Sequence, residues 1–150
     1  MFQIDKLREF KKNHPDKKVV FTNGCFDILH RGHVAYLNEA KSQGDFLILG
    51  LNSDASVKRL KGPERPINSE ADRKFVIENL KAIDLVVIFE EDTPYNLIKE
   101  AMPDMLVKGG DWSVDQIVGS NIVLAAGGEV KSLNFIDGFS TTGTISKIKS

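Results

Sequence analysis

Short apolar runs alternate with amphipathic stretches along the chain. The stretch around Ile4, Leu7 and Phe10 has the spacing of a short amphipathic helix, which should stop at Asn13-His14-Pro15. Residues 45–52 are nearly all apolar, as expected for a central parallel strand covered on both faces. The same reasoning predicts strands over residues 18–22, 45–52, 84–89, 105–108 and 129–135.

Helices are predicted between these strands. Gly44 would cap the first of them in a left-handed conformation, and Thr93-Pro94 would open another with proline at its first position. Residues 53–68 are polar and contain Gly62, Pro63 and Pro66, which predicts a long loop. Besides the N-terminal helix, five helices are expected: over residues 32–43, over 70–80, from 93 onward, over 115–126, and from about 140 to the end.

This alternation predicts one α/β domain over residues 1–150, a Rossmann-like doubly wound parallel sheet of five strands. Ligands of such sheets bind beyond the carboxyl ends of the strands, where the strand order reverses. Unusual residues follow four of the five predicted strands. The third strand ends in Glu90-Glu91-Asp92, which is typical of a solvated acidic loop and favours an edge position for that strand.

Composition narrows the class of protein. The chain has 150 residues, of which 41% are hydrophobic and 27% charged, as in ordinary globular domains. A net charge of −1 argues against nucleic-acid binding, and no apolar run approaches the roughly 20 residues that a membrane span needs. The charged N-terminus does not resemble a signal peptide, and the single cysteine, Cys25, is compatible with a reducing compartment. A cytoplasmic location is expected.

Residues 22–33, Thr-Asn-Gly-Cys-Phe-Asp-Ile-Leu-His-Arg-Gly-His, lie between the first predicted strand and its helix. A glycine-containing turn that enters a helix N-terminus is an anion site, because free N–H groups and the helix dipole both favour phosphate. His30 and His33 flank Gly32 at this junction. They are either donors to a phosphate or two ordinary, partly buried histidines. Cys25 has no base beside it and is interpreted as a small packing residue.

His30-x-Gly32-His33, preceded by Asn23-Gly24-x-Phe26-Asp27, resembles the signature of the nucleotidyltransferase superfamily that includes the cytidylyltransferases. The resemblance implies that a phosphate oxygen attacks the α-phosphorus of an NTP and that pyrophosphate leaves without a covalent intermediate. His30 and His33 would then donate hydrogen bonds to the phosphates in the transition state. Nucleotide contacts are expected from the rest of this turn, at Thr22, Asn23, Gly24, Phe26 and Gly32.

Two more strand ends carry candidate residues. Lys108-Gly109-Gly110-Asp111-Trp112 is either a glycine turn with a structural tryptophan or a nucleoside site approached closely by backbone. The resemblance assigns Lys108 to the phosphates and Gly110, Asp111 and Trp112 to the nucleoside. Ser140, Thr141 and Thr142 are either a plain helix cap or, by the same resemblance, the grip on the β- and γ-phosphates.

Cations are frequent between residues 58 and 74, and most of them are expected to be solvated. Arg73 matches the phosphate-contacting arginine that the superfamily carries in this helix, so it is predicted to be catalytic with His30, His33 and Lys108. Lys61 and Arg65 are candidates for closing over a second anionic substrate. The remaining candidates for substrate binding are Asp27, Asn52 and Asp54.

Longer segments resemble one branch of the superfamily, the D-glycero-β-D-manno-heptose 1-phosphate adenylyltransferases. They include residues 22–30, 52–62, 89–94 and 107–111. The chain departs from that branch at Phe139, where cysteine is frequent, and at Trp112, where tyrosine is usual and glycerol-3-phosphate cytidylyltransferases share the tryptophan. These departures leave the base and the acceptor less well defined than the phosphate chemistry.

The resemblance implies ATP and a sugar phosphate as substrates, Mg²⁺ held mainly by the ATP phosphates with no dedicated metal ligands, and a homo-oligomer. A separate heptose kinase would act in the same pathway. Two alternatives remain open: a cytidylyltransferase for glycerol 3-phosphate or a similar polyol phosphate, and a nucleotide-binding module without catalysis.

Overall fold

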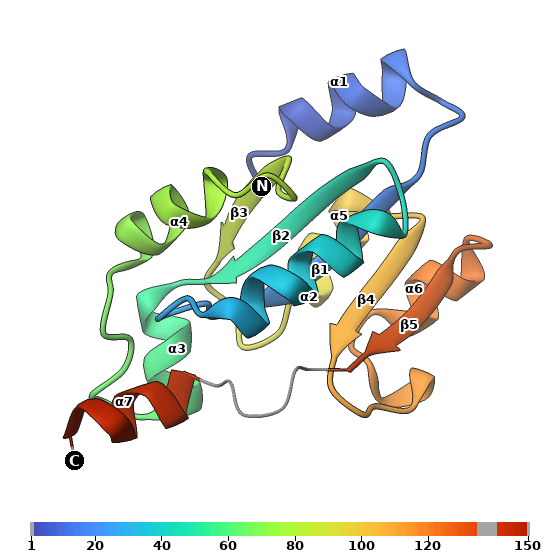
Figure 1. Ribbon diagram of the computed structural model, residues 1–150. Helices are drawn as coiled ribbons and strands as arrows, with labels where there is room; N and C mark the ends of the chain where they lie inside the picture. The colour runs from blue at the N-terminus through green and yellow to red at the C-terminus, as the bar shows by residue number, and fades with distance from the viewer. Residues whose placement is uncertain (1, 135–140, 150) are drawn as a thin grey trace.

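The computed structural model describes residues 2–134 and 141–149, which form a parallel sheet with helices on both faces (Figure 1). Its strands are β1 (Val19–Gly24), β2 (Phe46–Asn52), β3 (Leu85–Phe89), β4 (Met105–Gly109) and β5 (Glu129–Leu133). Its helices are α1 (Asp5–Asn13), α2 (Arg31–Ser42), α3 (Asp54–Lys61), α4 (Glu70–Glu78), α5 (Tyr95–Ala101), α6 (Ser120–Ala125) and α7 (Thr141–Lys149), with a 3₁₀ turn, η1 (Val114–Gln116). The predicted doubly wound α/β fold is confirmed.

The strand order is β3-β2-β1-β4-β5, and every neighbouring pair is parallel. The chain winds outward from the central strand to β3 and then passes back to β4 on the other side. The strand order therefore reverses between β1 and β4, the place where doubly wound sheets bind ligands. The third strand lies at one edge, as its acidic end predicted.

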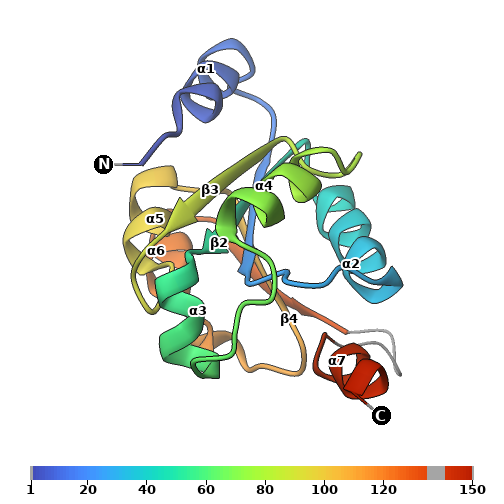
Figure 2. The ribbon, with the colours of Figure 1, turned by 90° about the vertical axis from the view of Figure 1, so that its left-hand side faces the viewer.

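Two apolar layers cover the sheet. Helices α2 and α4 pack on one face through residues such as Leu37 and Ile77, and α1, α5 and α6 pack on the other through Leu7, Leu97 and Val123. Figure 2 shows α2 on one side of the sheet and α5 and α6 on the other. Full burial of each such side chain contributes about 1.5–3 kcal/mol, so the core anchors the strand ends that carry the site.

The predicted loop over residues 53–68 is wrong in its first half, where the chain forms α3. The Ser53 hydroxyl accepts a hydrogen bond from the Ser56 N–H at 3.1 Å, and Asp54 lies in the first turn, where an acidic residue favours the helix dipole. Only Ser56 and Val57 of this helix are buried, so it lacks a broad apolar face. The helix matters for the site because it carries Lys61 at its end.

The helix predicted over residues 115–126 is also wrong in extent, because the chain forms η1 and then α6. Ile117 between them is extended and buried, and Gly119 has a left-handed φ of 86°. A side chain at Gly119 would place its Cβ 2.7 Å from Ile98 Cδ1. The turn lets the Ile117 side chain enter the core. Its burial stabilises the fold more than an unbroken helix over these residues would.

Gly44 and Pro94 differ in detail from their predicted roles. Gly44 is not left-handed; its Cβ would lie 2.7 Å from Val20 Cγ2, so the glycine is required for space. Pro94 is the N-cap of α5 and not its first residue. The last strand ends at Leu133, and the predicted ends at residues 135 and 140 lie outside the described residues. Within the described residues, no helix has the length and apolar character required to cross a membrane.

Candidate functional site

A cavity of about 420 Å³ opens at the carboxyl ends of β1, β2 and β4. Asn23 and Gly24 at the end of β1 and residues 25–27 of the following turn line it together with His33, Tyr36 and Asn52. One wall comes from Leu60 and Lys61 and from residues 92–94, and the other from Lys108, Gly109, Trp112 and residues 116–118. The cavity thus occupies the predicted binding position of a doubly wound sheet.

The two histidines lie at the start of α2, and each binds backbone. His30 is the N-cap, and its Nδ1 accepts a hydrogen bond from the Gly32 N–H at 3.1 Å. Nδ1 of His33 accepts a hydrogen bond from the His30 N–H at 3.3 Å. The rings stack with their centroids 3.9 Å apart, and His33 lines the cavity while His30 lies behind it. The predicted pair is therefore held rigidly by the start of the helix.

Both imidazoles are neutral in the free protein near pH 7. Burial lowers the pKa of His33 to about 4, assisted by the charges of His30 and Lys61, and burial also lowers the pKa of His30. In a neutral imidazole, one nitrogen accepts and the other carries the hydrogen. Since each Nδ1 accepts from backbone, each Nε2 carries a hydrogen and is a donor. Both rings are therefore neutral donors fixed at the start of α2, and of the two only His33 lines the cavity.

Lys108 and Trp112 form the wall at the end of β4. The Lys108 Nζ lies 5.5 Å from the centroid of the Trp112 ring, and the indole Nε1 donates to the Gly109 carbonyl at 3.1 Å. Burial lowers the pKa of Lys108, and the nearby Cys25 opposes this shift. Gly110 has a left-handed φ of 106°, which suits glycine, but neither it nor the exposed Asp111 lines the cavity.

The charges around the cavity favour an anion. Asp27 is ion-paired with Arg65 at 3.5 Å, and Asp92 is ion-paired with Arg59 at 2.7 Å. Within the described part of the chain, the cavity-lining lysines, Lys61 and Lys108, form no ion pair with a carboxylate. The cations that line the cavity are therefore not neutralised, whereas its carboxylates are.

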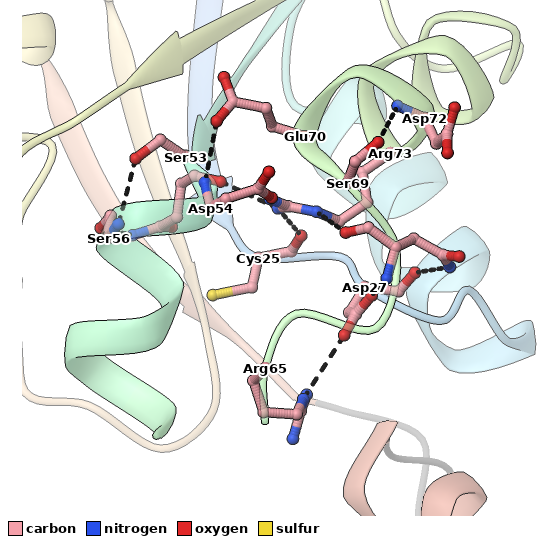
Figure 3. Close-up of polar contacts among 12 residues, drawn as sticks. Cys25, Asp27, Ser53, Asp54, Ser56, Arg65, Ser69, Glu70, Asp72 and Arg73 are labelled. Carbon is pink, nitrogen blue, oxygen red and sulfur yellow. Dashed lines mark hydrogen bonds and ion pairs between the residues drawn. The ribbon is translucent and has the colours of Figure 1, made fainter. Parts of the chain in front are cut away.

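Arg73, predicted to contact phosphate, is not among the residues that line this cavity. Its guanidinium contacts other parts of the protein instead (Figure 3). Its side chain is 0% exposed. Nε donates to the Asn68 carbonyl at 3.0 Å, and Nη1 donates to the carbonyls of Cys25 and Asn52 at 2.8 and 2.9 Å. Nη2 donates to the Asp54 carboxylate at 2.8 Å. With these bonds formed, the guanidinium is committed to the protein and not to a ligand.

Asp27, predicted to help bind substrate, is also committed to the protein. Its carboxylate accepts from the N–H groups of Ile67 and Asn68 at 2.6 and 2.8 Å, and its side chain is 0% exposed. Arg65 lies against it outside the cavity lining. Asp54 likewise lies outside the lining, paired with Arg73. Of the five predicted substrate-binding residues, Asp27, Asn52 and Lys61 line the cavity.

Some of the predicted nucleotide-binding residues line the cavity and others do not. Asn23, Gly24, Phe26 and Trp112 line the cavity. Thr22 lies in the core, where its hydroxyl is 2.7 Å from the Tyr36 hydroxyl, and Gly32 is buried inside α2. For the predicted phosphate grip, Thr141 and Thr142 are the first residues of α7, Thr142 is exposed, and Ser140 lies outside the described residues.

Several cavity residues escaped the sequence analysis. Asp92 and Thr93 follow β3, so the rule of residues after strand ends could have found them. Glu90, Glu91 and Asp92 are exposed, which agrees with the predicted solvated loop, and Asp92 lines the cavity as well, paired with Arg59. Tyr36 and residues 116–118 carry no local signal, because only the packing of α2 and η1 brings them to the cavity. Burial raises the pKa of the Cys25 thiol, which fits a packing residue better than a nucleophile.

Comparison with known proteins adds independent findings. A family model described as Cytidylyltransferase-like matches residues 21–141. The bifunctional protein HldE of Campylobacter concisus (strain 13826) is 57% identical over 146 residues, covering 97% of this chain and 30% of that protein. HldE of Aliarcobacter butzleri (strain RM4018) is 55% identical over 147 residues, covering 98% and 30%. The chain therefore spans about 30% of the length of these curated relatives.

Solved structures agree with the observed fold. The lipopolysaccharide core biosynthesis protein from Thermoplasma volcanium GSS1 is 30% identical with a TM-score of 0.63, covering 80% of this chain and 97% of that chain. Pantothenate synthetase from Thermus thermophilus is 18% identical with a TM-score of 0.50, covering 87% of this chain and 60% of that chain. The second likeness is one of fold alone.

Proposed function

The chain belongs to the cytidylyltransferase-like family, and from this we propose that it is an adenylyltransferase acting on D-glycero-β-D-manno-heptose 1-phosphate. The reaction would transfer AMP from ATP to the sugar phosphate, giving ADP-heptose and pyrophosphate. High identity to proteins named HldE and the likeness to a lipopolysaccharide core biosynthesis protein support this choice of substrate. The heptose motifs in the sequence support it as well.

The observation that carries the proposal is the pair of neutral imidazoles at the start of α2. Nδ1 of each ring is occupied by a backbone N–H, which leaves Nε2–H as the donor. A phosphate oxygen of the acceptor attacks the α-phosphorus, the bond to the bridging oxygen breaks, and pyrophosphate leaves with that bonding pair. Negative charge builds on the phosphate oxygens in this step. His33 Nε2–H, with His30 stacked on it, would stabilise that charge, which is commonly the largest catalytic term.

The two walls of the cavity suit the two substrates. On the wall of β4, Lys108 would neutralise the triphosphate while Trp112 offers an aromatic face to the nucleoside. On the opposite wall, Lys61 would bind the phosphate of the acceptor, and Asp92 and Thr93 would contact its hydroxyl groups. A sugar phosphate carries about −1.5 to −2 charges at pH 7, so its oxygen attacks without a general base. Catalysis then consists of positioning and charge stabilisation.

We propose that Mg²⁺ is bound mainly through the ATP phosphates. The donor set fits this mode, since the two acidic residues that line the cavity, Asp27 and Asp92, have their carboxylates engaged by Arg65 and Arg59. Mg²⁺ commonly takes few protein carboxylates when phosphates are present. When bound, the ion would supply further charge neutralisation on the phosphates.

The wider setting is also a proposal. A heptose kinase activity, on the same polypeptide or on another, would supply the sugar phosphate, and the name bifunctional of the relatives supports such a pairing. A homo-oligomer in the cytoplasm is the proposed form of the protein.

Pyrophosphate release tests the function directly. The protein is incubated with Mg²⁺ and either ATP or CTP, each with β-heptose 1-phosphate or glycerol 3-phosphate. Release with ATP and the heptose alone supports the proposal, and release with CTP and glycerol 3-phosphate replaces it by the polyol alternative. Nucleotide binding without pyrophosphate release from any pair would indicate a binding module.

A further inference from the structure

Arg73 joins three separate segments of the chain (Figure 3). Its guanidinium binds the Cys25 carbonyl in the turn after β1, the Asn52 carbonyl at the end of β2, and the Asn68 carbonyl before α4. These partners are 48, 21 and 5 residues away in the sequence. A buried arginine whose donors are satisfied by carbonyls defines the spacing of those backbones.

Asp27 makes a second connection between the same two loops. Its carboxylate accepts from the N–H groups of Ile67 and Asn68, and its own carbonyl accepts from Asn68 Nδ2 at 3.0 Å. The turn at residues 25–27 is therefore held on both sides of Phe26. Neither connection uses a residue that a substrate could displace, because both side chains have no exposed surface.

Phe26, between these two anchors, has an unusual backbone. Its φ is 45°, in the left-handed region that an aromatic residue rarely adopts without support from its surroundings. This conformation puts its ring 5.2 Å from the ring of His33, centroid to centroid. Gly24 leaves room for that ring, since a Cβ there would lie 2.6 Å from Phe26 Cε2. The position of the histidine thus depends on the turn.

We propose that Arg73 is a positioning residue, which holds the turn at residues 25–27 so that Phe26 keeps His33 in its reactive orientation. The inference rests on the proposed function for its catalytic consequence, but its structural part is independent of any substrate. It replaces the predicted phosphate contact of Arg73 with an indirect role, through Cys25 and Phe26.

The only cysteine of the chain reports on this turn. Cys25 lines the cavity, and burial raises the pKa of its thiol, so alkylation by iodoacetamide at neutral pH should be slow. Arg73→Lys keeps the positive charge but loses the planar fork that spans the carbonyls. We expect Cys25 to react about fivefold faster or more in this variant, because the freed turn exposes the thiol.

The matched control is Arg8→Lys on α1, which changes an exposed arginine paired with Glu100 far from the cavity. Alkylation in this control should match that of the wild type. Thermal unfolding followed by circular dichroism verifies that both variants are folded. Should Arg73→Lys fail to fold, Asn68→Ala takes its place, since it removes one exposed side chain and its single bond to the Asp27 carbonyl.

Steady-state kinetics provide the second measurement. In folded Arg73→Lys, we expect kcat to fall by about 10- to 100-fold, because small displacements of a catalytic group are costly, while the KM for ATP changes much less. A purely structural role would leave kcat per folded molecule unchanged. Unaltered alkylation of Cys25, or unaltered kcat in a folded variant, would overturn the inference. Absence of turnover in the wild type would instead contradict the proposed function, and the alkylation rate would still decide the role of Arg73.

Discussion

His33→Ala removes the donor that the proposed reaction needs most. His33 lines the cavity at the start of α2, and of the two stacked histidines it is the one that does so. Loss of one fixed donor to transition-state charge costs about 2.7–4 kcal/mol, or roughly 10²- to 10³-fold in kcat. The Kd for ATP should change by less than about tenfold, because Lys108 and the helix N-terminus still bind phosphate in the ground state.

The same change has a smaller effect on stability. The His30 N–H loses its acceptor at 3.3 Å, and the rings of His30 and Phe26 lose a packing partner. The hydrogen bond accounts for about 0.5–1.5 kcal/mol of the free energy of unfolding, so the variant should remain folded.

The assay is pyrophosphate release under saturating substrates, with ATP binding measured by calorimetry and folding by urea denaturation. His14→Ala is the control, since His14 is exposed in the loop after α1 and contacts only the ring of Phe10 among aromatic residues in the described chain. A folded His33→Ala with kcat within about fivefold of the wild type would refute the donor role, because that loss is below the range for a missing transition-state donor.

Three further predictions concern stability and geometry. The pKa of His33 is about 4 in the folded protein and 6.5 ordinarily, so stability is complete above pH 6.5 and is lost as pH falls toward 4. The full shift is worth about 3 kcal/mol, reduced by solvent screening to about 1–2 kcal/mol, and urea denaturation at pH 7 and pH 4.5 measures the loss. Gly24→Ala should lower kcat about tenfold or more while the protein stays folded, because the added Cβ displaces the ring of Phe26 that packs on His33. Leu97→Ala on α5 should lower the free energy of unfolding by about 2–5 kcal/mol, because this side chain is 0% exposed in the core.

Each of these three predictions can be contradicted by a specific result. Stability that does not fall between pH 7 and 4.5 more in the wild type than in His33→Asn would contradict the depressed pKa. Normal turnover in Gly24→Ala would show that the ring of Phe26 does not position the histidine. For Leu97→Ala, the comparison is Leu124→Ala at an exposed position, which should change stability by less than about 0.5 kcal/mol; equal effects would contradict the described core.

Local patterns explain what could be predicted of the fold. The strand at 46–52 is buried at every position, so its apolar run identifies it without knowledge of its neighbours. The short helix α3 buries only Ser56 and Val57, and its polar remainder looks like a loop. Gly119 is a local signal for the break between η1 and α6, whereas its close approach to Ile98 on α5 exists only in the folded chain.

In the candidate site, too, features that depend on local contacts could be predicted and those that depend on distant contacts could not. His30 and His33 could be assigned to a helix start because their hydrogen bonds span two or three residues. The contacts of Arg73 could not be predicted, since its carbonyl partners Cys25 and Asn52 are 48 and 21 residues away. In the sequence, a cation on a helix near a phosphate motif suggests a ligand contact. The burial of Arg73 results from the packing of α4 against two loops, which the sequence does not show.

The sequence by itself determined the order of the five strands along the chain, the edge position of the third strand, and the histidine pair at a helix start after the first strand. Each of these follows from periodicity, capping or turn residues that act over a few positions. Tertiary structure alone decided that the pKa of His33 is lowered to about 4 and that the Arg73 side chain is fully buried against carbonyls of distant segments. Those outcomes depend on desolvation and on hydrogen bonds between distant segments, which exist only once the sheet has brought its strand ends together.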